Sequence, residues 1–273
     1  MIGKSNGIID RLIFQLIILK NTKLSAERVE SWKPEDKENP WELSGLFEGD
    51  IMLNDVTKNG LLDETTRWPA GVVPLYIEEE DFGELIDPSS RFVLCPTFTK
   101  ETDDDYVIIK GSKAGCWSSV GRQGKGQVLN LQKTGCLKHG TIVHELLHAL
   151  GFYHQQSSAD RDDFVKIHWE NIKEGKENNF NKYDRSTITD YNVGYDYGSV
   201  MHYSGFAFSK NGERTITPLE EGAVIGQRES LSDKDITKLQ AMYKEECGDR
   251  KPEGDGDNSN ESSLVDSLGW LFE

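Results

Sequence analysis

Residues 144–154 read HELLHALGFYH, and this run constrains the fold and the chemistry of the chain more than any other feature. His144 and His148 are four residues apart, so on a helix both imidazoles project from one face. Gly151 has no Cβ and can take the positive φ that ends a helix and turns the chain back. That turn can bring His154 beside the first two histidines. Three imidazoles with an open fourth position are typical of a catalytic zinc site, whereas structural zinc sites are closed.

Glu145 follows the first histidine and is expected beside the same site without occupying it. A carboxylate there can take a proton from a metal-activated water and pass it to a leaving amine. Farther along, residues 199–203 read SVMHY, in which Met201 can form an apolar floor beneath the metal. Together the two motifs match the signature of the metzincin peptidases. The alternative is a buried amphipathic helix that carries histidines by chance, and it leaves the register of these residues unexplained.

Several further blocks make the chain similar to a known family. They are RWPAGVVP at 67–74, GCWSSVGR at 115–122, GTIV at 140–143 and DRD at 160–162. With these blocks, the chain closely resembles the astacin family of zinc endopeptidases. The likeness runs from around Phe47 to Cys247, which is most of the chain.

The resemblance implies a fold and a set of roles. The expected fold class is α+β, a two-lobed metzincin (zincin) fold. It has a small twisted amino-terminal sheet, the zinc helix below a horizontal cleft, and a largely irregular carboxy-terminal lobe. His144, His148 and His154 are expected to bind one Zn2+, and Glu145 to act as the general base. Tyr203 would contact zinc at rest and swing to stabilise the tetrahedral oxyanion, since a phenol O–H aimed at developing negative charge lowers its energy.

Hydrophobic patterning indicates where the main elements lie. The predicted elements are strands at 72–77, 106–109 and 116–120 and helices at 141–150 and 232–245. By resemblance, the strand at 116–120 forms the upper rim of the cleft, where a peptide substrate adds antiparallel to its exposed edge. The last helix has Ser232 as its expected N-cap, with Asp235 three residues on.

The resemblance also assigns a role to the charged stretch at 21–58. It contains FEGDIML at 47–53, and a glycine-aspartate pair read alone is most simply a turn. The family carries a similar pro-segment whose aspartate occupies the open zinc position, which makes Asp50 the expected zymogen latch. Alignment with the family puts the mature amino terminus at Asn59, directly after Lys58. We therefore expect a trypsin-like protease to activate the chain.

Two departures from the family pattern matter. The family usually has a glutamate directly after the third histidine, where it receives the new amino terminus, and here that residue is Gln155. A glutamine can accept a hydrogen bond from the terminus at Asn59, but it offers no ion pair. The second departure is the stretch 78–94, where the family has a long helix. Here it is shorter and interrupted by Gly83 and Pro88, which disfavour a helix.

The four cysteines allow three disulfide connectivities from sequence alone. The family resemblance implies the pairs Cys95–Cys247 and Cys116–Cys136. Four free thiols in a cytosolic protein would be the alternative. Disulfides indicate an oxidising compartment, so the resemblance favours a secreted protein.

Charge and length narrow the choice of partners. The 273 residues carry a formal net charge of −16, which argues against nucleic acid, because phosphates need clusters of Lys and Arg. A chain of this length can bury a substantial core without help from metals. We expect a monomer that acts on protein or peptide substrates.

The two ends of the chain are expected to lie outside the catalytic domain at 59–247. Residues 1–20 include the apolar run 12–19, a possible signal segment with a charged interruption just before it. A mis-assigned start or a helical pro-segment are the alternatives, and the run is too short for stable membrane insertion. Residues 248–273 are acidic and polar and are expected to be a disordered tail, with an N-glycosylation sequon at Asn260.

These observations lead to one main hypothesis and two rivals. The main one is a secreted zinc endopeptidase that is made as a zymogen and uses Glu145 as its general base. The first rival is a catalytically silent pseudoprotease of the same family that acts as a protein-binding module. The second is another metal-assisted hydrolase with the same ligands. Intact zinc ligands, Glu145 and Tyr203 speak against the first rival, whereas Gln155 and the shortened stretch 78–94 favour it.

Overall fold

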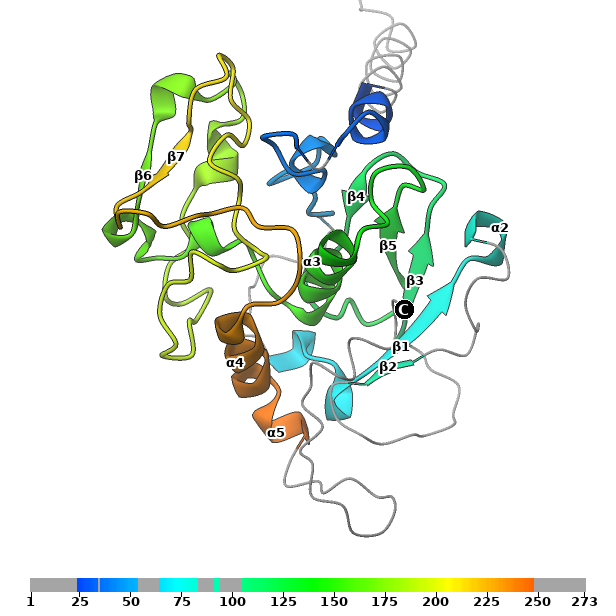
Figure 1. Cartoon of the computed structure of the whole chain (residues 1–273). Helices are drawn as coiled ribbons and strands as arrows, with labels where there is room; N and C mark the ends of the chain where they lie inside the picture. Colours follow the sequence, from blue (N-terminus) through cyan, green and yellow to red (C-terminus); the bar gives the residue numbers. More distant parts are fainter. Residues whose placement is uncertain (1–23, 34, 54–63, 83–90, 94–104, 248–273) are drawn as a thin grey trace, which may run out of the picture.

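A mixed five-stranded sheet organises the first half of the structure (Figure 1). The structure is a computed structural model that describes residues 24–33, 35–53, 64–82, 91–93 and 105–247. The strands lie in the order β2–β1–β3–β5–β4. Their bounds are β1 Val72–Ile77, β2 Arg91–Val93, β3 Val107–Lys110, β4 Cys116–Trp117 and β5 Gln127–Leu131. Strands β1, β3 and β5 run parallel, whereas β2 and β4 pair antiparallel at the two edges. This half is therefore an open sheet that ends in a two-residue edge strand.

The predicted metal-binding helix packs against the sheet as α3 (His139–Leu150), which lies beside β5 in Figure 1. Every residue of α3 after the first is buried. The helix ends where expected, because Gly151 takes a φ of +113° and its N–H donates to the carbonyl of His148. Outside the helix, the indole of Trp68 donates to the Ala149 carbonyl at 2.8 Å. The sheet and the segment around Trp68 thus fix α3 in place.

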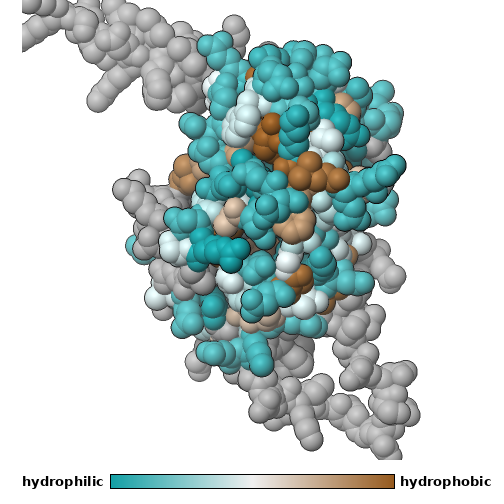
Figure 2. All heavy atoms as spheres, turned by 90° about the vertical axis from the view of Figure 1, so that its left-hand side faces the viewer, coloured by the Kyte–Doolittle hydropathy of each residue, from teal (hydrophilic) through white to brown (hydrophobic). Residues whose placement is uncertain are grey.

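The second half is built mainly from turns and short 3-10 helices around a two-stranded sheet. Strands β6 (Val165–Ile167) and β7 (Ile216–Pro218) pair antiparallel. This half has its own apolar core, which includes Ile172, Phe180 and Phe208. Figure 2 shows the molecule from the left-hand side of Figure 1, where β6 and β7 lie. On this face the surface is mostly hydrophilic, and its apolar side chains form small, separate groups. The α+β fold class and the largely irregular second half are therefore confirmed.

The predicted helix at 232–245 is found as two shorter ones, α4 (Asp233–Met242) and α5 (Lys244–Cys247). Ser232 is the N-cap, as expected. Its hydroxyl accepts from the Asp235 N–H at 2.9 Å, and in return the Asp235 carboxylate accepts from the Ser232 N–H at 3.1 Å. The split occurs at Tyr243, whose φ of −101° and ψ of 14° leave the helical region. In Figure 1 helix α4 lies below α3, and α5 follows beneath it.

The amino-terminal segment lies between the two halves. Residues 24–30 form a helix, and the chain then continues through a 3-10 turn at Trp41–Leu43 (blue in Figure 1). The end of the segment runs along the sheet edge. Ile51 pairs in parallel with Ser118, and the N–H of Met52 donates to the Ser118 carbonyl at 2.8 Å. The regular part of the strand predicted at 116–120 is shorter than expected, and its continuation pairs with this segment.

Several expectations fall on residues that lie outside the described part of the chain. They are the segments 1–20 and 248–273, the cleavage site Lys58–Asn59, and Cys95. In the stretch 78–94, helix α2 covers only Glu79–Phe82 and β2 begins at Arg91, with 83–90 outside the description. Within the described residues, no helix combines the length and the apolar character needed to cross a membrane.

The N-cap of α4 offers a test of the fold. We expect Ser232→Ala to destabilise the protein by about 1 kcal/mol, because it removes the side-chain acceptor for the first turn of the helix. The Ser232 hydroxyl also donates to Asp196, so the loss should not fall below that figure. Urea unfolding followed by circular dichroism measures it. The exposed Ser230, changed in the same way, is the control, and equal stability of the two variants would contradict the capping argument.

Candidate metal centre

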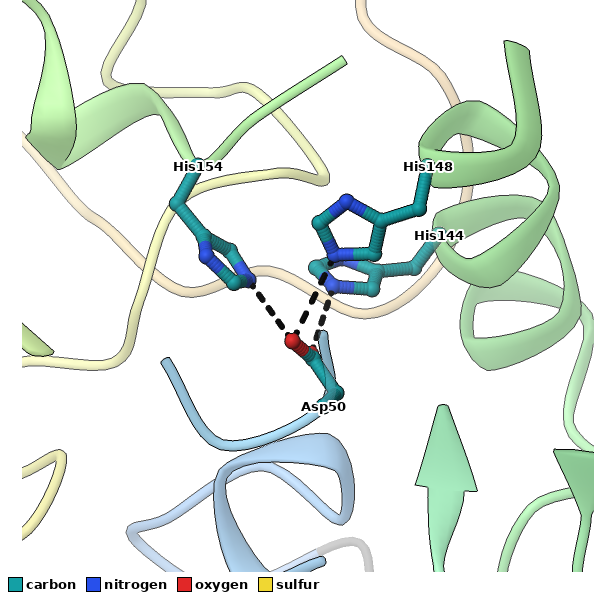
Figure 3. A group of neighbouring side chains, drawn as sticks. All are labelled: Asp50, His144, His148 and His154. Atoms are coloured by element: carbon teal, nitrogen blue, oxygen red, sulfur yellow. Dashed lines mark hydrogen bonds and ion pairs between the residues drawn. The ribbon is translucent and has the colours of Figure 1, made fainter. Parts of the chain in front are cut away.

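Three histidines and one aspartate converge on a single buried point (Figure 3). His144 and His148 project from the same face of α3, and the turn at Gly151 brings His154 round to face them. Asp50 reaches the same point from the amino-terminal segment on the opposite side. All four of these side chains are fully buried or nearly so. The structure thus brings together the three predicted ligands and the predicted latch.

The spacing of these atoms suits a tetrahedral zinc ion. The Asp50 carboxylate lies 3.1 Å from Nε2 of His144, 3.5 Å from Nε2 of His148 and 3.3 Å from Nε2 of His154. Ligand bonds of about 2.0–2.1 Å in tetrahedral geometry would separate neighbouring ligand atoms by about 3.3 Å. Asp50 Oδ1 and two of these Nε2 atoms are buried without a hydrogen-bond partner, which is expected of atoms whose partner is a metal. The donor set therefore fits Zn2+.

The opposite ring nitrogen of each histidine is also occupied. Nδ1 of His144 lies 2.9 Å from the Val200 carbonyl, and Nδ1 of His148 lies 2.7 Å from the Phe152 carbonyl. An acceptor at Nδ1 places the proton there and leaves Nε2 free to bind a metal. Nδ1 of His154 instead lies 2.8 Å from the carboxylate of Glu48, a residue of the amino-terminal segment.

The electrostatics of the two acids at the site differ. Burial raises the pKa of Glu145 well above its usual range, and the nearby charge of Asp50 raises it further. Both carboxylate oxygens of Glu145 are buried, and none of the residues that the structure describes forms a hydrogen bond with them. Burial also acts to raise the pKa of Asp50, but the adjacent His154 and His148 outweigh it and hold that pKa well below its usual range. Burial and neighbouring charges thus shift the pKa values of Glu145 and Asp50 in opposite directions.

Of the other predicted site residues, Tyr203 and Met201 are buried, whereas Gln155 is half-buried. The Tyr203 ring lies 4.7 Å from that of His154, and its hydroxyl donates to the Glu48 carbonyl at 2.6 Å. Met201 is buried in the core that contains α3, and its carbonyl accepts from the Gln155 N–H at 2.9 Å. The side-chain carbonyl of Gln155 accepts from a lysine of α4 rather than facing the ligand cluster.

The amino-terminal segment contributes two contacts that the sequence reading missed. The Trp41 indole is fully buried and stacks on the imidazole of His144, with the ring centres 4.2 Å apart. Next to it, the carboxylate of Glu42 accepts from the N–H and the hydroxyl of Ser204, at 2.6 and 2.9 Å. Burial raises the pKa of Glu42 from 4.5 to about 7. A tryptophan within a charged stretch was the one available signal that this segment packs against something.

One of the two expected disulfides is confirmed. Cys116 and Cys136 are bonded and link strand β4 to the loop before α3. The partner expected for Cys247 lies outside the described residues, so the pair Cys95–Cys247 stays a prediction.

Comparison with known proteins gives a consistent picture. The peptidase family described as Astacin matches residues 61–244. Zinc metalloproteinase nas-14 of Caenorhabditis elegans is 38% identical over 266 residues, which cover 82% of this chain and 52% of that protein. Seminal metalloprotease 1 of Drosophila melanogaster is 40% identical over a match that covers 76% of this chain and 89% of that protein. Meprin A subunit alpha of Rattus norvegicus is 43% identical over a match that covers 72% of this chain and 27% of that protein. The chain therefore spans about half the length of nas-14 and a smaller share of the meprin subunit.

Among solved structures, the chain is similar to high choriolytic enzyme 1, a hatching-enzyme zinc protease of Oryzias latipes. The TM-score is 0.55 at 32% identity, with 71% of this chain and 98% of that chain covered. The fold and the site therefore define a zinc metalloendopeptidase. The chain belongs to the astacin family, and its zinc-binding histidines and Glu145 are intact.

Loss of a ligand should remove the metal. We expect His148→Gln to lower the zinc content of the purified chain from near one ion to well below one, because the glutamine cannot replace a neutral imidazole in the cluster. Elemental analysis after dialysis measures the content. His168→Gln is the control, since His168 bonds to Thr217 outside the cluster and should keep a full zinc complement. Retention of zinc by both variants would place the ion elsewhere.

Proposed function

We propose that this chain is the latent zymogen of a secreted zinc endopeptidase that hydrolyses peptide bonds in extracellular proteins. The observation that carries the proposal is the position of Asp50, whose carboxylate lies within 3.1–3.5 Å of all three ligand Nε2 atoms. A catalytic zinc needs an open fourth position for water or substrate. An aspartate in that position takes the place of the water and keeps the enzyme silent.

The course of the same segment along the cleft edge supports this role. The Ser118 N–H donates to the Asp50 carbonyl at 3.0 Å, and the Ser118 carbonyl accepts from Met52. These are the backbone groups that a peptide would use to add to the edge of the sheet. The segment pairs in parallel there, whereas a substrate is expected to pair antiparallel. It would thus cover the substrate edge without presenting its own peptide bond as a substrate does.

The proposed mechanism assigns one task to each side chain. His144, His148 and His154 hold the zinc, which when bound acidifies a water molecule and polarises the substrate carbonyl. Glu145 takes the proton of the attacking water and passes it to the leaving amine. Tyr203, freed from the Glu48 carbonyl, donates its O–H to the developing oxyanion.

We propose that activation is a cut between Lys58 and Asn59 by a trypsin-like protease, which separates the pro-segment 21–58 from the catalytic domain 59–247. The new amino terminus at Asn59 would then approach Gln155. The side-chain carbonyl of Gln155 already accepts from Lys238 Nζ at 2.6 Å, so this contact would lack an ion pair. We expect a less tightly held mature terminus than a glutamate would give.

The disulfide Cys116–Cys136 supports an oxidising, extracellular location. We propose the pair Cys95–Cys247 as a second, longer-range bond, and the ends 1–20 and 248–273 as a signal segment and an acidic tail. A monomer acting on protein or peptide substrates fits this organisation. The zinc ligands and Glu145 are present, which favours the enzyme over the pseudoprotease, although Gln155 and the shortened stretch 78–94 remain departures from the family pattern.

The proposed base gives a direct test. We expect protein that starts at Asn59 to hydrolyse casein, and Glu145→Gln to reduce the rate by about 100-fold or more, because it removes the proton acceptor. The variant should keep its zinc, since Glu145 does not belong to the ligand cluster. Treatment with 1,10-phenanthroline should abolish hydrolysis by the parent protein. An unreduced rate in zinc-loaded Glu145→Gln would rule out this residue as the base.

The buried carboxyl of Glu42 gives a pH-dependent test of pro-segment docking. Its pKa is raised from 4.5 to about 7 when docked, so docking takes up a proton between these values. Inhibition of the processed protein by a peptide of residues 36–53 should therefore be strongest at acidic pH and weaken as pH rises from 4.5 to 7, then level off. The inhibition constant should change by on the order of 100-fold in that window.

The same peptide with Glu42→Gln is the control, because its side chain has no titrating carboxyl. The ratio of the two inhibition constants cancels the titration of all other groups, so it isolates Glu42. A ratio that stays constant with pH would show that this carboxyl does not take up a proton on docking.

A further inference from the structure

The three ligand histidines are not supported in the same way. Nδ1 of His144 and Nδ1 of His148 face backbone carbonyls of the catalytic domain, at 2.9 and 2.7 Å. Nδ1 of His154 faces Oε2 of Glu48 at 2.8 Å. No other acceptor for that nitrogen is recorded among the residues that the structure describes. The third histidine is therefore oriented by a side chain that leaves with the pro-segment.

Glu48 is itself held firmly in this position. Its side chain is fully buried, and its second oxygen, Oε1, accepts from the Tyr183 hydroxyl at 2.6 Å. Its backbone is held as well, since its N–H donates to the Asn179 side chain and its carbonyl accepts from the Tyr203 hydroxyl. Its φ of +46° is uncommon for a residue with a side chain, and the surrounding contacts hold it there. The carboxylate thus has a defined place beside His154.

We propose that Glu48 is a positioning residue of the metal centre: it orients His154 and strengthens zinc binding while the pro-segment is attached. The proposal rests on the proposed role of residues 21–58 as a removable segment. It gives this segment a second task besides covering the cleft, which is to complete the zinc site during folding and storage. On activation, Asp50 and Glu48 would leave together, and the site would lose one ligand and one supporting carboxylate.

Two physical effects support this assignment. A carboxylate that accepts from the far nitrogen of a ligand imidazole fixes its tautomer and ring orientation and makes it a better ligand. Such charge-assisted hydrogen bonds are stronger than those to neutral carbonyls. In addition, a buried dication is balanced best by nearby negative charge, and the segment brings two carboxylates to one buried place. Glu48 therefore acts on zinc through His154 without touching the ion.

The test compares two buried glutamates of the same segment in the full chain. Glu48→Gln keeps the size of the side chain but removes the carboxylate beside His154. Glu42→Gln is the matched control, because Glu42 is equally buried but bonds to Ser204 rather than to a ligand histidine. Zinc affinity is measured by competition with a chromogenic chelator. We expect about a 10-fold or greater loss of affinity for Glu48→Gln. The loss should be clearly smaller for Glu42→Gln, which alters the contact of the segment with Ser204 but leaves the carboxylate beside His154 in place.

A second variant guards against a merely structural effect. Tyr183→Phe leaves Glu48 in place but removes the hydroxyl that holds its Oε1, so a smaller loss of zinc affinity is expected. For each protein, the rise in unfolding temperature caused by zinc is also measured, since this rise follows metal affinity and not the stability of the metal-free fold. It should shrink for Glu48→Gln and shrink much less for Glu42→Gln.

The proposal is overturned if Glu48→Gln binds zinc as tightly as the parent chain, or if both glutamine variants weaken zinc equally. If Glu48→Gln does not fold, an unchanged zinc affinity in Tyr183→Phe overturns it instead. The result is independent of peptidase activity. Processed protein that does not cleave casein would refute the proposed function while leaving the order of zinc affinities to decide this inference.

Discussion

The structure depends on one constraint: three imidazoles and one carboxylate meet at a single buried point. A carboxylate removed from water and placed among imidazoles is unfavourable unless a cation or strong donors compensate for it. Zinc meets that need at the ligand spacing observed here. Because the ligands come from α3, from the turn directly after it and from the amino-terminal segment, the same ion would tie that segment to a distant part of the chain. The glycine turn at Gly151 and the buried face of α3 are the local conditions that let this happen.

The amino-terminal segment is held by separate contacts of different kinds. Trp41 stacks on a ligand histidine, Glu42 bonds to Ser204, Glu48 bonds to His154, and Asp50 faces the ligand cluster. While the segment is covalently attached, its effective concentration at the cleft is high, on the order of millimolar or more, so local opening is followed by rebinding. A cut in the chain does not break any of these contacts. It would remove the tether, so that dissociation becomes irreversible on dilution, and in this way proteolysis would act as the proposed switch.

The parts of the fold and site that could be predicted are those that depend on residues close together in the sequence. The helix with His144 and His148, its end at Gly151 and the cap at Ser232 each need only a few neighbouring residues, and the structure has them where expected. The helix after that cap was expected to be continuous, but it breaks at Tyr243. The partners of Glu48 and Glu42 lie 106 and 162 residues away, and no periodicity encodes such distances. Strands β6 and β7 were missed for a related reason, since three-residue strands in a turn-rich region carry almost no pattern.

The residues around Gln155 explain why a glutamine can stand where the family usually has a glutamate. Lys238 on α4 is buried, and burial lowers the pKa of its ammonium, while the charges of Asp235 and Asp196 oppose that shift. Its Nζ donates to the Gln155 carbonyl in a cavity of roughly 290 Å3. A neutral amide suits this partner, because it accepts one hydrogen bond without adding charge to a pocket where Asp235 already supplies it. A second ammonium entering this pocket would meet a resident cation at short range, in a medium where like charges repel strongly. We therefore expect removal of the pro-segment to contribute more to activation in this chain than capture of the new amino terminus.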